Sequence, residues 1–170
     1  MLDHVFPYPK RLRRLGNVIW VYQKSGVYKA IRKTKILDKV AKPLAQLEKA
    51  LPMIDPPSKR YEPGSIIPAK GEKKGQVAFF LGCVSDAVLH RTNRLSIELL
   101  ASIGLEVVIP AKQNCCGALH SHQGKMDQAR ALARKNIEEF EETGAEFYVN
   151  NAGGCGAMLS EYDHLLREDD

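Results

Sequence analysis

The four cysteines are the residues of this 170-residue chain best suited to metal or redox chemistry. Cys83 and Cys155 stand alone, whereas Cys115 and Cys116 are adjacent in the sequence. No apolar run approaches the roughly 18 to 20 residues needed to cross a bilayer, and the N-terminus lacks the apolar core of a secretory signal. We therefore expect a cytoplasmic protein, in which reduced cysteines act as metal ligands or redox groups before they form disulfides.

Several chemistries are compatible with four thiols in this arrangement. An iron–sulfur cluster typically takes four cysteine ligands. A structural zinc site can also use four thiolates, although its ligands usually come in CxxC pairs, which this sequence lacks. The Cys115-Cys116 pair could form a redox-active disulfide, and a lone cysteine such as Cys83 is often a small buried apolar residue. No carboxylate is adjacent to any cysteine, which argues against a hard-cation site.

The part of the chain that carries the cysteines alternates between strand and helix patterns. Short apolar runs bounded by glycine or proline predict strands at 76–81, 106–109 and 146–150. Helical periodicity follows each strand, over 88–103, 126–140 and 156–166. On the first of these helices, one apolar face is expected to carry Val88, Thr92, Leu95, Leu99 and Ile103. The alternation predicts an α/β fold in which parallel βαβ units form three layers.

Each cysteine position follows one of the predicted strands. Cys83 comes after the first, Cys115 and Cys116 after the second, and Cys155 after the third. Because the carboxyl ends of parallel strands meet at one edge of a sheet, we expect the four thiols to lie together there. The helix N-termini that follow favour thiolates, and the glycines around the cysteines let the backbone approach a ligand closely.

The histidines add less to this argument. His120 and His122 follow the cysteine pair and could donate hydrogen bonds to a cluster sulfur or replace a ligand. An exposed loop position is the more common situation for a residue such as His122. His90 falls off the predicted apolar face of its helix, so we expect it at the surface.

The two parts of the chain differ in charge. Residues 1–74 hold 17 Lys and Arg against 6 Asp and Glu, a balance of +11, and residues 75–170 hold 8 against 14, a balance of −6. We therefore predict two units: a basic helical segment with a Pro-rich linker at 1–74, and a cysteine-rich domain at 75–170. The basic segment could meet a membrane surface or an acidic partner, whereas its aromatic residues are too sparse for binding nucleic acid.

Within the basic segment, apolar periodicity predicts helices over 12–22 and 37–51. Pro43 should either kink the second helix or begin a helix of its own. Prolines over 52–75 predict an extended linker.

Three cysteine motifs resemble a known family. They are Phe80-Leu81-Gly82-Cys83, the run from Asn114 to His120, and the run from Asn151 to Met158. They are similar to the cysteine-rich CCG domain of heterodisulfide reductase subunits, anaerobic glycerol-3-phosphate dehydrogenase and lactate-utilisation proteins. The chain resembles in particular the first CCG repeat of glycolate oxidase iron–sulfur subunits, and residues 9–51 resemble the helical stretch before that repeat.

The resemblance implies a cofactor and its ligands. The family's cluster ligands correspond to Cys83, Cys115, Cys116 and Cys155, which implies an iron–sulfur cluster of the [4Fe–4S] type, with zinc as the alternative. The residues that would surround the cluster are Gly117, His120 and Gly154. Met158 stands where the fullest family motif has a further cysteine, which puts a five-cysteine cluster in doubt and leaves a four-thiolate cluster.

The resemblance also implies a function. The chain would be a non-catalytic electron-transfer subunit of a glycolate or other 2-hydroxy acid dehydrogenase complex. A flavoprotein subunit would oxidise the substrate, and the cluster would pass electrons to a quinone-linked acceptor, with the complex cytoplasmic and peripheral at the inner face of the membrane. Ferredoxin-type motifs and a second CCG repeat are missing from the sequence, so we expect a piece of a longer subunit. The alternatives are a zinc-holding or metal-free docking module of such a complex, and a disulfide-handling subunit with Cys115 or Cys116 as nucleophile.

Overall fold

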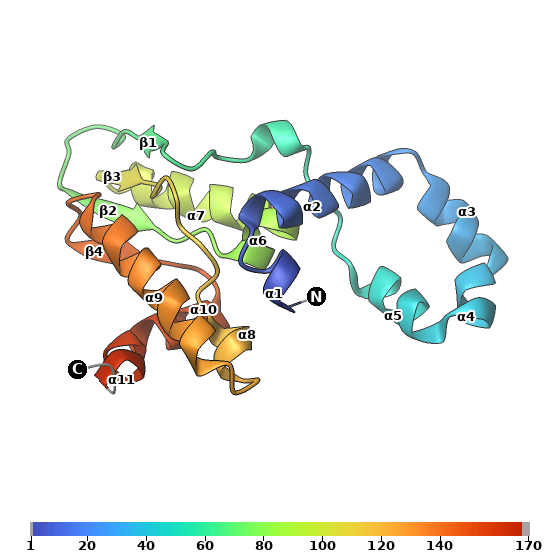
Figure 1. Ribbon diagram of the computed structural model, residues 1–170. Coiled ribbons are helices and arrows are strands. Elements are labelled where there is room, and N and C mark those ends of the chain that lie inside the picture. Colours follow the sequence, from blue (N-terminus) through green and yellow to red (C-terminus); the bar gives the residue numbers. More distant parts are fainter. Residues whose placement is uncertain (1, 168–170) are drawn as a thin grey trace.

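A mixed four-stranded sheet lies at the centre of the structure, a computed structural model that describes residues 2–167 (Figure 1). Its strands are β1 (Ile66–Ile67), β2 (Gly75–Phe79), β3 (Leu105–Val108) and β4 (Phe147–Val149), in the spatial order β1-β3-β2-β4. β2 pairs in parallel with both β3 and β4, so that Val77 lies between Val107 and Phe147. The predicted strands and their parallel pairing are thereby confirmed.

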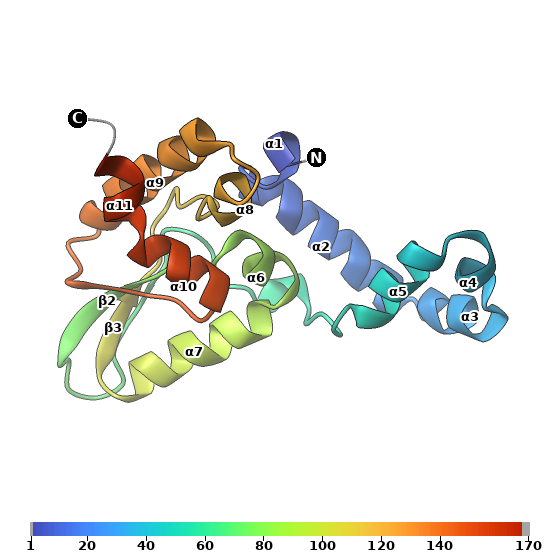
Figure 2. The same cartoon turned by 90° about the horizontal axis from the view of Figure 1, so that it is seen from below.

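Helices cover both faces of this sheet and complete the predicted three layers (Figure 2). The helices are α6 (Cys83–Val88), α7 (His90–Ser102), α8 (Ala118–Ser121), α9 (Met126–Glu141), α10 (Gly153–Ser160) and α11 (Tyr162–Leu166). α7 covers one face, over a core of Val77, Phe79, Leu81, Ile97, Val107 and Ile109. α9, α10 and α11 cover the other face, where Phe80, Ala129, Ala133, Met158, Tyr162 and Leu165 pack together. Successive strand residues point to opposite faces, which is why Phe79 and Phe80 belong to different cores.

The face of α7 that meets the sheet differs from the predicted one. Three residues of the predicted apolar face are 49% to 64% exposed: Leu95, Leu99 and Ile103. The buried residues of α7 are His90, Asn93, Ile97 and Ala101. Two of them are polar and have polar neighbours, since Asn93 Nδ2 donates to the Leu81 carbonyl at 2.8 Å and His90 Nδ1 lies 3.5 Å from Arg60 Nη2. The expected surface position of His90 is therefore wrong.

The N-terminal part is helical, as predicted. Its elements are α1 (Leu2–Val5), α2 (Pro9–Lys24), α3 (Val27–Thr34), α4 (Ile36–Val40), α5 (Lys42–Ala50) and the 3₁₀ turn η1 (Pro57–Lys59). Pro43 stands at the start of α5, which confirms the second of the two expectations for this proline. α2 lies against α6, whereas α3, α4 and α5 extend away from the sheet (Figure 1). No helix within residues 2–167 is long and apolar enough to span a membrane.

The extended stretch after α5 returns to the sheet. Ile66 and Ile67 form β1, which runs antiparallel to β3. Further along, Lys70 N donates to the Ala101 carbonyl and Lys74 N to the Gly104 carbonyl, both at 2.8 Å. The segment predicted as a linker thus adds an edge strand and backbone hydrogen bonds to the cysteine-bearing part of the chain.

Candidate metal centre

The structure brings the four cysteine positions to one edge of the sheet. Cys83 is the first residue of α6, Cys115 and Cys116 lie in the loop before α8, and Cys155 lies in the first turn of α10. All four are free thiols. The Sγ atoms of Cys83 and Cys115 are 3.6 Å apart, and Cys155 Sγ lies 3.7 Å from where a Cβ atom on Gly82 would stand. Cysteines far apart in the sequence are therefore neighbours in space.

The four thiols form a chain of sulfur contacts in which acidity alternates. Hydrogen bonding from Cys115, and next from Cys155, lowers the pKa of Cys116 to about 3. The contact with Cys115 also lowers the pKa of Cys83. The hydrogen bond to Cys116 in turn raises the pKa of both Cys115 and Cys155. Thiolates are thus favoured at two positions, Cys83 and Cys116, and each lies in contact with a neighbouring thiol.

Backbone N–H groups reinforce this preference for negative sulfur. The Val84 N–H is hydrogen-bonded to the Cys83 sulfur, and the Ala118 N–H to the Cys116 sulfur. Both donors lie in the first turn of a helix, where N–H groups are free to bind an anion. The site is electrostatically suited to thiolate ligands.

A buried polar network from α9 and α11 binds the backbone of the cysteine pair. Asn136 of α9 is fully buried, and its Nδ2 donates to the Cys115 carbonyl at 3.0 Å and to Tyr162 Oη at 3.1 Å. Tyr162 of α11 donates its hydroxyl to the Cys116 carbonyl at 2.8 Å, and Asn136 Oδ1 accepts the Asn114 N–H at 2.8 Å. Side chains from two helices thereby fix the backbone of the cysteine loop.

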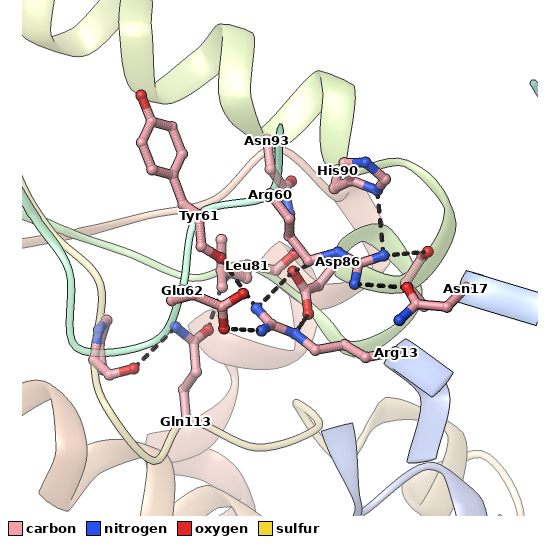
Figure 3. Close-up of polar contacts among 12 residues, drawn as sticks. Arg13, Asn17, Arg60, Tyr61, Glu62, Leu81, Asp86, His90, Asn93 and Gln113 are labelled. Atoms are coloured by element: carbon pink, nitrogen blue, oxygen red, sulfur yellow. Dashed lines mark hydrogen bonds and ion pairs between the residues drawn. The ribbon is translucent and has the colours of Figure 1, made fainter. Parts of the chain in front are cut away.

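Gln113 ties this loop to the end of β2 (Figure 3). Its Oε1 accepts the Leu81 N–H at 2.8 Å, and its Nε2 donates to the Pro110 carbonyl at 3.3 Å. The loops that carry Cys83 and Cys115 are therefore joined through one buried amide. The sequence analysis did not single out Gln113, Asn136 or Tyr162, because nothing in their local patterns indicates partners more than 20 residues away.

The three residues expected around the ligands have different environments. Gly117 has a φ of +89° and precedes α8, and a Cβ there would lie 3.3 Å from the Ala129 carbonyl oxygen. This position therefore requires glycine. His120 is fully buried in α8. Gly154 is exposed, with open space around its Cβ position. His122 is exposed as well.

Helix α2 also reaches the site. Leu12 packs in one buried cluster with Cys83, Ala87, Cys115 and Leu132. The N-terminal segment, which the sequence separates by charge, thus contributes to the surroundings of two of the four thiols.

The part of the chain that carries the cysteines matches a known family model. Residues 77–160 match the family model described as the cysteine-rich domain CCG. Residues 77–160 therefore form a cysteine-rich domain of the CCG family. Outside this CCG domain, residues 1–51 match the model described as the linker region of the glycolate oxidase iron–sulfur subunit.

The relatives that the chain matches are longer than the chain itself. It is 41% identical to the probable glycolate oxidase iron–sulfur subunit of Bacillus subtilis (strain 168), over 97% of this chain and 37% of that protein. It is 36% identical to lactate utilization protein A of Exiguobacterium sp., over 55% of this chain and 38% of that protein. It is 40% identical to an uncharacterized iron–sulfur protein of Methanocaldococcus jannaschii, over 54% of this chain and 19% of that protein. The chain thus spans less than two fifths of each of these proteins, and no solved structure matches it.

The donor set of the CCG domain fits an iron–sulfur cluster. Such clusters are held by cysteine thiolates, typically four, and four free thiols lie together here. Within residues 2–167, no three His, Cys, Asp or Glu side chains are grouped so that they could hold a metal ion. The sulfurs contact one another in series, Cys83 with Cys115, Cys115 with Cys116 and Cys116 with Cys155, so the fit to a cluster lies in the kind and number of the ligands.

Proposed function

We propose that Cys83, Cys115, Cys116 and Cys155 hold an iron–sulfur cluster of the [4Fe–4S] type. The observation that supports this most is the gathering of four free thiols, from the segments that follow three parallel strands, at one edge of the sheet. When bound, such a cluster takes up and releases single electrons.

The chain's own residues bind and shield this site. Cys83, Cys115 and Cys116 are at most 8% exposed, so three of the four ligands are shielded from water. Cys155 is more accessible, and Gly153 and Gly154 beside it are exposed. Electrons would therefore enter or leave most directly along α10, where the least protein covers a ligand.

We further propose that the chain is the electron-transfer part of a subunit in a complex that oxidises a 2-hydroxy acid such as glycolate. The names of its relatives, glycolate oxidase iron–sulfur subunit and lactate utilization protein A, support this assignment. A flavoprotein subunit would remove electrons from the substrate, and a quinone-linked acceptor would receive them. The complex would be cytoplasmic and peripheral at the inner face of the membrane.

The first test is the iron and acid-labile sulfide content of the chain, with its visible spectrum, after purification without oxygen. We expect about four iron and four sulfide per chain. Cys116→Ser should lose the visible absorption, whereas Ala157→Ser, an exposed position on the same helix as Cys155, should keep it. Zinc, or no metal in a folded wild-type chain, would refute the cluster and favour a docking module.

The second test concerns the division of labour. The loaded chain alone should not oxidise glycolate, because the substrate chemistry is assigned to the flavoprotein. With glycolate as the source of electrons, it should be reduced only when the flavoprotein subunit is also present. Glycolate oxidation by the isolated chain would contradict the proposal.

A further inference from the structure

We infer that Arg13 of the N-terminal helix α2 is a positioning residue of the cysteine site, which fixes the start of α6 at Cys83 and adds positive charge beside it. This inference rests on the proposed cluster for its electrostatic part only. Its structural part concerns the chain itself.

Arg13 reaches Asp86, which lies one helical turn after Cys83 in α6 (Figure 3). Its Nε lies 2.5 Å from Asp86 Oδ2, and its Nη2 lies 3.1 Å from Asp86 Oδ1. The remaining donors bind the Tyr61 carbonyl at 3.1 Å and the carboxylate of Glu62. Such a two-pronged pair fixes both side chains in orientation as well as in distance.

A second guanidinium meets the same carboxylate. Arg60 Nε lies 3.9 Å from Asp86 Oδ1, and Arg60 donates to Asn17 Oδ1 and to the Ala87 carbonyl, both at 3.2 Å. The side chain of Arg60 is 5% exposed and that of Asp86 is 6% exposed. Two cations thus share one buried anion. The other carboxylate nearby, that of Glu62, is 69% exposed, so water screens its charge.

Close packing of α2 on α6 makes this bridge rigid. A Cβ on Gly16 would lie 2.2 Å from the Ala87 carbonyl oxygen, so only glycine allows the two helices to approach this closely. Arg13, Asp86 and Cys83 line one small cavity of about 20 Å³, which has room for one water molecule. The charged pair therefore lies directly beside the first ligand position.

Two consequences follow from this arrangement. Loss of the two-pronged contact should free α6 and make Cys83 more accessible. The excess of positive charge should also favour whichever state of the site is more negative, which is the reduced state of a cluster with thiolate ligands.

The experiment uses the chain purified without oxygen and compares Arg13→Gln, Asp86→Asn and Arg13→Lys with the wild type. Arg14→Gln, which changes the same charge at the next and exposed position of α2, is the matched control. The first measurement is the rate at which a maleimide labels Cys83 in metal-free protein, located by mass spectrometry. We expect faster labelling in all three variants and an unchanged rate in Arg14→Gln.

The second measurement is the ratio of reduced to oxidised cluster at a potential fixed at the wild-type midpoint. Removing a cation should lower this ratio in Arg13→Gln, and removing the anion should raise it in Asp86→Asn, each by a factor on the order of ten. Arg13→Lys keeps the positive charge but loses the two-pronged contact with Asp86, so it should leave the ratio of reduced to oxidised cluster near the wild-type value. If the role of Arg13 were purely structural, Arg13→Gln and Asp86→Asn would shift the ratio of reduced to oxidised cluster in the same direction. That result would overturn the electrostatic part of the inference.

The two measurements keep this inference apart from the proposed function. A wild-type chain without iron and sulfide would refute the cluster, and with it the electrostatic part, but the labelling rates would still decide whether Arg13 positions Cys83. Labelling rates equal to those of Arg14→Gln in all variants would refute the positioning role, whatever the metal content.

Discussion

Asn136→Leu should be among the most damaging single substitutions in this chain, although Asn136 carries no chemistry of its own. The asparagine is 0% exposed and makes three hydrogen bonds, to the Cys115 carbonyl, to Tyr162 Oη and from the Asn114 N–H. Leucine has a similar size, so the substitution removes the polar contacts without opening a large cavity.

The expected cost can be worked out from these contacts. A group that is left without its hydrogen-bond partner costs about 1 to 3 kcal/mol, and two groups, the Cys115 carbonyl and the Asn114 N–H, lose theirs. Burying additional apolar surface offsets about 1 to 2 kcal/mol of this loss. We therefore expect the free energy of unfolding to fall by about 3 kcal/mol. Tyr162→Phe removes the hydroxyl that contacts Asn136 and the Cys116 carbonyl and should lower the free energy of unfolding by about 1 to 2 kcal/mol.

Urea unfolding of metal-free protein under a reductant measures both values. The dependence on denaturant should stay constant, so that the shift in midpoint reports stability. Lys135→Leu, an exposed neighbour on the same helix, is the control and should change the free energy of unfolding by no more than about 0.5 kcal/mol. An Asn136→Leu chain as stable as this control would show that the network does not hold the cysteine loop.

Two further predictions concern packing and pH. Gly16→Ala should lower the free energy of unfolding by about 1 to 3 kcal/mol, because its Cβ would meet the Ala87 carbonyl oxygen. Gly153→Ala, with open space around its Cβ, should change it by less than about 1 kcal/mol, and equal losses in the same urea titration would refute the close contact of α2 and α6. Burial, and next the charge of Arg60, lowers the pKa of His90 below 6.5. The folded state thus favours the neutral ring, so its contribution to stability is complete above pH 6.5 and declines as the pH falls below that value. His90→Asn should reduce the loss in the free energy of unfolding between pH 6.5 and 5. The same dependence on pH in the wild type and the variant would count against a lowered pKa of His90 as its cause.

The strands could be predicted because they depend on local information, and the gathering of the cysteines could be predicted from the strands. Short apolar runs bounded by glycine or proline identify strands, and parallel pairing then brings the residues that follow them to one edge. The apolar face of α7 could not be predicted in the same way. Asn93 is buried there because it binds the Leu81 carbonyl, while Leu99 is 64% exposed, and periodicity assigns polar residues to the surface without regard to partners elsewhere in the chain.

Charge is a less direct guide to the site than the cysteines are. The balance of +11 for residues 1–74 and −6 for residues 75–170 separates the chain into two parts. An average over a segment does not show where a single cation lies, however. Arg13 belongs to the basic part and Asp86 to the acidic part, and the two meet at 2.5 Å across 73 positions of sequence. The opposite charges of the two parts therefore support their association at this contact, beside the first cysteine, as well as marking them as different.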